Sequence, residues 1–264
     1  MAIARPKRGV LTRHALRDAR LPTALTGVVL LVLASAAVLS SPSLRTRDGA
    51  ATAHEDLPLD LAGLLGVSDS DTMASSVGHL DATFFSVVLP VVLLALAIPL
   101  AARSIASLVT SGELEFLGGQ AITMRDLVVE RFVAVVAAAA QAAVPSVLLI
   151  VVASGIGDLE LGLFGAVLAV LRAMAVVAFV TACTVAASCL TRSATTSVAV
   201  GVGVAIVVFG TSALGATAVI SPARWALTTA VAGGGNPLGL VVVAAVAVAV
   251  VVFAAARFEE ADAV

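Results

Sequence analysis

Long apolar runs alternate with shorter polar segments along this chain. Six runs are long enough to cross a membrane, since a helix needs about 20 mostly apolar residues to span roughly 30 Å of hydrocarbon. The runs are continuous Ala, Val and Leu rather than an alternation of apolar and polar residues, so they predict helices and not a barrel. The predicted spans cover approximately residues 23–41, 82–102, 130–153, 161–182, 197–220 and 238–256.

The connections between these runs contain no soluble domain, so we expect residues 1–264 to form a single transmembrane domain. The longest connection, residues 42–81, contains an apolar stretch at 57–67 that is too short to cross a bilayer. This stretch forms either a surface helix or a loop packed under the spans. The first run follows a basic segment, as in a signal peptide, but it exceeds the usual apolar region of about 7–15 residues. We therefore predict an uncleaved span.

Composition supports the same class of protein. Hydrophobic residues make up 60% of the chain and the mean hydropathy is +1.12, whereas apolar residues make up about half of an average soluble domain. The fold class expected is therefore an all-α integral membrane protein with six transmembrane helices. We expect a multi-pass protein of the plasma membrane, in contact with membrane lipid and with no nucleic-acid partner.

The distribution of Lys and Arg predicts the orientation. The N-terminal segment and the second, fourth and C-terminal connections together hold eleven of these residues, and the opposite connections hold three. By the positive-inside rule, both termini are cytoplasmic. The eleven are Arg5, Lys7, Arg8, Arg13, Arg17, Arg20, Arg103, Arg125, Arg131, Arg192 and Arg257, and the three are Arg45, Arg47 and Arg224.

Two polar residues are predicted inside the bilayer. Arg172 lies about eleven residues into the fourth predicted span, and Gln141 lies at a similar depth in the antiparallel third span. A buried Arg is costly unless it is paired or hydrated, so we expect a hydrogen bond between the two residues or a polar cavity at Arg172. The alternative is a shifted span from which Arg172 reaches outward to water.

The sequence contains no set of residues for catalysis. The predicted spans hold no His and no carboxylate near their centres, so neither an intramembrane hydrolase nor a metal site is expected. No GxxxxGK[ST] phosphate-binding loop occurs, so this chain is not expected to hydrolyse ATP by a P-loop mechanism. We predict a protein that is not itself an enzyme and binds no cofactor.

Small residues are concentrated in the fifth predicted span. Gly201, Gly203, Ala205 and Gly210 lie along this one helix. Such residues allow helices to pack closely. We expect packing within the bundle here, with a translocation lining or a dimer face as the alternative.

The polar segment between the second and third spans is the most informative part of the chain. Residues 103–132 concentrate charge and read as a helix, a Gly118-Gly119 break and a second helix that begins near Thr123. Thr123 followed three residues later by Asp126 is typical of a helix N-cap. The cytoplasmic connection predicted between the second and third spans covers residues 103–129.

Three stretches of this segment carry a resemblance to a known family. They are Arg103-Ser104-Ile105, residues 111–117 (SGELEFL) and residues 123–129 (TMRDLVV). With the six-span layout, they resemble the loop between spans two and three of type-2 ABC transporter permeases, especially prokaryotic and archaeal ones. The charged turn typical of that family is replaced here by the uncharged Ser107-Leu108-Val109-Thr110, and its usual Pro is Ala121.

The resemblance implies a function as well as a fold. It implies a permease subunit, present as a homodimer or with a homologous subunit, that works with a separate ABC ATP-binding subunit holding ATP and Mg, in the export direction. The loop would dock into that subunit. The docking residues it implies are Glu113, Leu114, Glu115, Phe116, Leu117, Arg125 and Asp126.

Functions other than that of a permease are also consistent with this sequence. A membrane assembly factor or scaffold could present the same polar segment without moving a substrate, and an amphipathic loop could simply lie on the membrane. A secondary transporter is disfavoured, because the spans lack central acids and paired broken helices. The Ala, Val and Leu of the spans do not identify a substrate.

Overall fold

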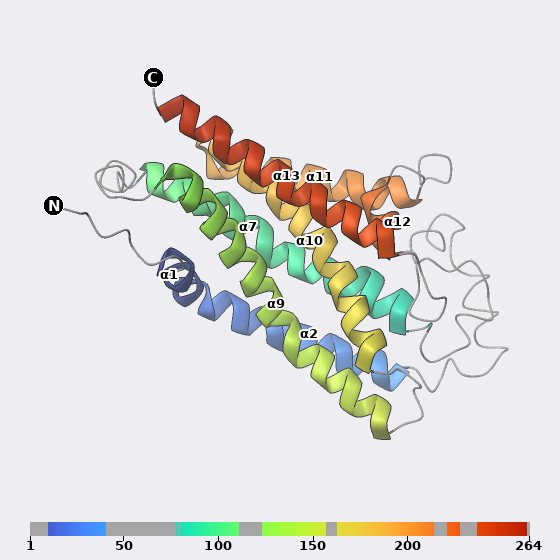
Figure 1. Cartoon of the computed structure of the whole chain (residues 1–264). Helices are drawn as coiled ribbons and strands as arrows, with labels where there is room; N and C mark the ends of the chain where they lie inside the picture. Colours follow the sequence, from blue (N-terminus) through green and yellow to red (C-terminus); the bar gives the residue numbers. More distant parts are fainter. Residues whose placement is uncertain are drawn as a thin grey trace.

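The described part of the chain is helical, with short turns. The computed structural model describes residues 10–40, 78, 80–110, 123–156, 163–213, 221–227 and 237–262. Its elements, labelled as in Figure 1 apart from η2, are α1 (Val10–Asp18), α2 (Arg20–Ser40), the π-helix η2 (Asp81–Val88), α7 (Leu89–Thr110), α9 (Met124–Ile156), α10 (Leu163–Thr191), α11 (Ala194–Ala213), α12 (Pro222–Leu227) and α13 (Pro237–Asp262). The apolar stretch at 57–67 lies outside the described residues.

Six of the described helices are long and apolar enough to cross a membrane, which confirms the predicted number of spans. The protein is therefore an all-helical, multi-pass membrane protein. Each of the six apolar runs identified in the sequence corresponds to one of these helices. The candidate spans are Arg20–Leu39, Thr83–Val109, Met124–Ser154, Leu163–Thr191, Ala194–Thr211 and Leu238–Glu260.

Several helices continue beyond the apolar runs that predicted them. The second run ends near residue 102 but α7 continues to Thr110, and α9 begins at Met124, before the third run. Hydropathy marks the part of a helix that suits hydrocarbon, whereas the helix itself continues until a cap or a break ends it. The second span also begins as the π-helix η2, in which the Leu89 N–H bonds to the Phe84 carbonyl five residues back.

Helix α10 lies at the centre of the bundle. It packs against α7, α9, α11 and α13, and its buried residues are mostly Ala, Val, Ser and Thr. Small side chains let neighbouring helix backbones approach closely, which is how membrane helices associate without a hydrophobic driving force. Helix α2 lies at the edge instead: it packs along α9 and has only sparse contact with α7.

One end of the bundle holds most of the described Arg residues, together with several carboxylates. The helix α1, the C-terminal end of α7, the N-terminal end of α9 and the C-terminal end of α13 lie together there (Figure 1). We call this the basic end. The described Arg residues of these and the adjoining helix ends are Arg13, Arg17, Arg20, Arg103, Arg125, Arg131, Arg192 and Arg257.

Helices α10 and α11 are joined at the basic end by a tight turn. Only Arg192 and Ser193 separate them, and Arg192 adopts a left-handed backbone conformation with φ of 53°. Its guanidinium lies 5.8 Å from the centre of the Phe258 ring of α13. One turn earlier, the Ser188 hydroxyl donates a 3.0 Å hydrogen bond to the Ala102 carbonyl of α7. These contacts tie α7, α10, α11 and α13 together at this end.

The small residues of α11 divide into two groups. A Cβ at Gly201 would overlap Thr184 Oγ1 and lie 2.9 Å from Ile98 Cγ2, so this glycine allows α11 to pack against α7 and α10. A Cβ at Gly203 or Gly210 would meet nothing within 4 Å. Gly201 therefore fulfils the predicted packing role, and the other two glycines face open space.

Candidate functional site

The structure describes both ends of the segment between the second and third spans. Helix α7 extends into this segment and ends at Thr110, and α9 begins within it at Met124. Glu113, Leu114, Glu115, Phe116 and Leu117, together with the Gly118-Gly119 break, lie outside the described residues. Of the docking residues predicted from the sequence, the structure therefore places Arg125 and Asp126.

The start of α9 is fixed by a reciprocal cap, as predicted. The Asp126 N–H donates a 3.1 Å hydrogen bond to Thr123 Oγ1, and the Thr123 hydroxyl donates a 2.8 Å bond to Asp126 Oδ2. A cap of this kind satisfies N–H groups that have no partner inside the helix, and it favours an acid near the helix N-terminus. It holds Arg125 and Asp126 in the first turn of the helix.

Arg125 and Asp126 are exposed beside an open hollow at the basic end. This hollow, the rim hollow, has a cavity volume of ≈ 560 Å³ and lies between α9, α1 and α13. Its apolar wall includes Val129, Val133 and Val252. Opposite charges beside an apolar wall are suited to a protein partner, because charge fixes register and apolar area supplies contact.

The N-terminal helix α1 is bonded to the same region of α9. The Thr12 N–H donates to Glu130 Oε2 at 3.2 Å, and the Thr12 hydroxyl lies 3.3 Å from that oxygen and 3.4 Å from the Glu130 carbonyl. The Glu130 carboxylate thus lies at the N-terminal turn of α1, where the helix dipole favours a negative charge. A helix therefore precedes the first span, and it is attached to the third span.

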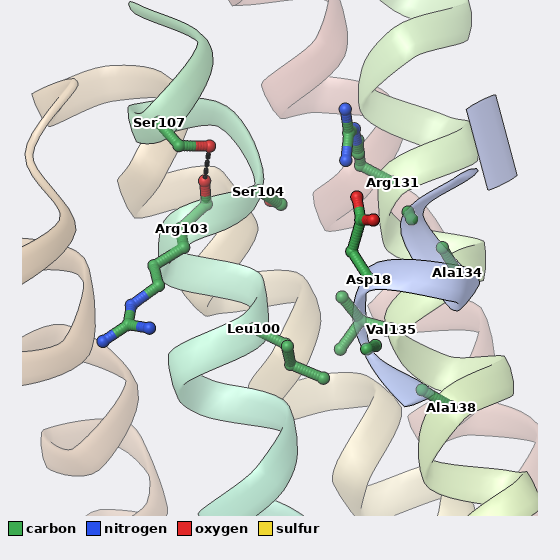
Figure 2. Close-up of a pocket in the computed structure, with 11 residues that line it drawn as sticks. Asp18, Leu100, Arg103, Ser104, Ser107, Arg131, Ala134, Val135 and Ala138 are labelled. Atoms are coloured by element: carbon green, nitrogen blue, oxygen red, sulfur yellow. Dashed lines mark hydrogen bonds between the residues drawn. The ribbon is translucent and has the colours of Figure 1, made fainter. Parts of the chain in front are cut away.

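A second, smaller pocket lies behind this contact. It has a cavity volume of ≈ 200 Å³ and is lined by α1, α7 and α9. In Figure 2 the Asp18 carboxylate points toward Arg131, whereas Arg103 leaves α7 on the far side from both. We call this the inner pocket. Ser104 and Ser107 also line it, and each hydroxyl donates a 2.6 Å hydrogen bond to a carbonyl of α7.

The predicted pairing of Arg172 with Gln141 is wrong. Arg172 is buried, with 4% of its surface exposed, and its Nη1 has no hydrogen-bond partner among the described residues. Gln141 is exposed on α9. The charged group that acts on Arg172 is instead Asp81, buried at the start of η2. Arg172 also lies nearer one end of α10 than expected, nine residues after Leu163 and nineteen before Thr191.

Sequence reasoning missed three features of these sites. It did not identify Thr12 as a partner of Glu130, the inner pocket around Asp18 and Arg131, or the effect of Asp81 on Arg172. Only Asp81 had a local signal, as the acid that directly precedes the second apolar run. In the described residues, no group of three or more His, Cys, Asp or Glu could hold a metal ion.

The basic end thus combines a rigid helix start, exposed opposite charges and two hollows. Comparison with protein-family models, with curated proteins and with solved structures finds no match for this chain.

Proposed function

We propose that this chain is the membrane-spanning permease subunit of an ABC transporter, working in the export direction. A separate ATP-binding subunit would dock on the segment between the second and third spans. The observation that carries the proposal is the placement of Arg125 and Asp126. They are exposed in the first turn of a helix that continues into the membrane without a break from Met124 to Ile156.

A continuous helix suits the task of passing movement from a partner into the bilayer. Helix α9 has 33 residues and is therefore roughly 50 Å long at about 1.5 Å per residue. Its capped start keeps the exposed charges in register with the rest of the helix. A partner that displaces Arg125 and Asp126 would tilt or shift the third span as a unit.

The bonds between Thr12 and Glu130 extend this effect to the first span. Helix α1 is attached to α9 through Glu130, and α2 follows α1 after Ala19 alone. Helix α2 also packs along α9 through the membrane. Movement of α9 would therefore carry α1 and α2 with it, which gives the bundle a group of helices that responds to docking.

The rim hollow supports a protein partner at this place. Arg125 and Asp126 provide both signs of charge, and the valines beside them provide apolar contact area. The partner would hold ATP and Mg, because the chain contains no phosphate-binding loop. A second permease subunit, identical or homologous, would complete the transporter in the plasma membrane.

Co-purification from the native membrane tests this proposal. The tagged chain is solubilised in mild detergent, and its partners are identified by mass spectrometry. We expect a P-loop ATPase in near-equal amount, with Arg125→Glu and Glu113→Lys lowering its recovery without affecting membrane insertion. Arg257→Glu, the same charge change at an exposed site on α13 at the basic end, is the matched control and should leave recovery unchanged.

Two results would contradict the proposal. One is recovery of the chain without any ATPase, and the other is an equal loss of ATPase in the Arg257 control. A further assay separates a transporter from a scaffold that also binds an ATPase. In proteoliposomes, the reconstituted pair of a transporter should hydrolyse ATP faster than the ATPase alone, whereas a scaffold should leave the rate unchanged.

A further inference from the structure

An apolar groove runs between α2 and α7 at the depth of the membrane. It arises because α2 packs along α9 and makes only sparse contact with α7. The cavity volume of this groove is ≈ 590 Å³, within the range of about 300–1,000 Å³ typical of small-molecule sites. Leu25, Val29 and Val91 on its walls are exposed by 60%, 48% and 48%, so they are open to whatever fills the groove.

Arg103 closes one end of this groove. It is exposed, and no described carboxylate lies within ion-pair distance of its guanidinium. Side chains on a helix lean toward its N-terminus. Accordingly, in Figure 2 the Arg103 side chain runs from α7 toward the level of Leu100, away from Ser107 at the end of the helix. Its charge therefore lies back toward the level of Leu100, which also lines the groove, and not beyond the helix end.

The groove adjoins the inner pocket. Leu100 and Arg103 line both cavities. Within the inner pocket, the Asp18 carboxylate faces Arg131 (Figure 2). The negative charge of Asp18 is therefore directed at the positive charge of Arg131. Arg103 is left as the positive charge on the apolar groove.

This arrangement matches one class of occupant. An apolar channel that opens toward hydrocarbon suits an acyl chain, and an Arg at its end suits a phosphate, which guanidinium binds with paired N–H groups. Basic pockets between membrane helices are typical sites for anionic lipid headgroups. We propose that the groove between α2 and α7 binds a membrane lipid with a phosphate headgroup, its acyl chain against Leu25, Val29 and Val91 and its phosphate on Arg103. The site lies within this chain and requires no partner subunit.

Native mass spectrometry of the full-length chain in detergent tests this site. The chain is titrated with phosphatidylglycerol and, separately, with diacylglycerol that carries the same acyl chains and no phosphate. We expect phosphatidylglycerol to bind more tightly. Arg103→Gln should weaken its binding roughly tenfold, because a charge-assisted bond is lost, and Arg103→Lys should restore part of it. Arg257→Gln is the control for charge at the same end of the bundle and should bind as the unaltered chain does.

A second variant tests the groove itself. Ala95 lines the groove and is exposed, so Ala95→Phe should fill the groove without disturbing the core. It should reduce binding of both lipids, whereas Arg103→Gln should reduce only that of phosphatidylglycerol. The proposal is overturned if Arg103→Gln binds phosphatidylglycerol as tightly as the unaltered chain. It is equally overturned if Ala95→Phe abolishes a dimer of this chain but leaves lipid binding intact, since a second copy would then occupy the groove.

Discussion

Thr12 and Glu130 are bonded to each other although 118 residues separate them in the sequence. The backbone N–H and the hydroxyl of Thr12 both lie within hydrogen-bond distance of one Glu130 carboxylate oxygen. This contact fixes the helix before the first span to the beginning of the third. It makes α1 part of the helical structure at the basic end and more than a charged flank.

Removing the Glu130 carboxylate should release α1 from α9. We expect Glu130→Ala to weaken the attachment by roughly 1.5–3 kcal/mol, the range for hydrogen bonds to charged groups. Thr12→Val keeps the backbone N–H and should have the smaller effect. Trypsin cleavage after Arg13 and Arg17, which are exposed, reports the release. Equal cleavage rates in Glu130→Ala and the unaltered chain would show that α1 is held by other contacts.

The contribution of the Thr123 cap to the stability of the first turn of α9 should be measurable. Thr123→Ala removes the oxygen that accepts the Asp126 N–H, and losing an N-cap side chain costs about 1 kcal/mol. We expect faster amide hydrogen exchange over the first turn of α9, with little change in the apolar part of the helix. Thr123→Ser retains the oxygen and serves as the control. If both variants exchange alike, the cap does not stabilise this turn.

Gly201 and Gly203 offer a matched pair for testing helix packing. Gly201→Ala places a methyl group against Thr184 and Ile98, and overpacking of this kind typically costs 1–3 kcal/mol. Gly203→Ala meets open space and should be neutral or slightly stabilising, because Ala favours helix over Gly by up to about 1 kcal/mol. Thermal unfolding in detergent should rank the variants in this order. A loss of stability for Gly203→Ala alone would reverse the assignment.

The influence of Asp81 on Arg172 can be tested by a double-mutant cycle. Asp81→Asn removes the negative charge that acts on the buried guanidinium, so it should destabilise the fold. Arg172→Met removes the buried charge and its unpaired Nη1. In the double variant the loss should be smaller than the sum of the single effects, by the roughly 0.5–3 kcal/mol typical of interacting residues. Strictly additive losses in unfolding free energy would show that the two charges act independently.

Local patterns predicted the parts of this fold that local chemistry decides. The six spans follow from continuous apolar runs, and the cap follows from Thr123 and Asp126 at the right spacing. Each depends on residues that are near each other in sequence. The boundaries were less accurate because apolar composition marks hydrocarbon depth and not the last helical turn.

The pairing of helices could not be obtained in this way. Helix α9 is apolar around most of its circumference, so periodicity does not show which face is buried. Gln141 was therefore expected to face Arg172, whereas it is exposed. The contacts of Thr12 with Glu130 and of Asp81 with Arg172 join residues from separate helices, and they depend on how those helices are rotated and packed.

The tight turn at Arg192 and Ser193 limits how the bundle can open. Because only two residues separate α10 from α11, these helices cannot move apart at the basic end, and the contact of Arg192 with Phe258 keeps α13 beside them. Any separation of these helices would therefore occur at the opposite end of the bundle. Helices α1, α2 and α9 lie outside this turn, so it does not restrict their movement.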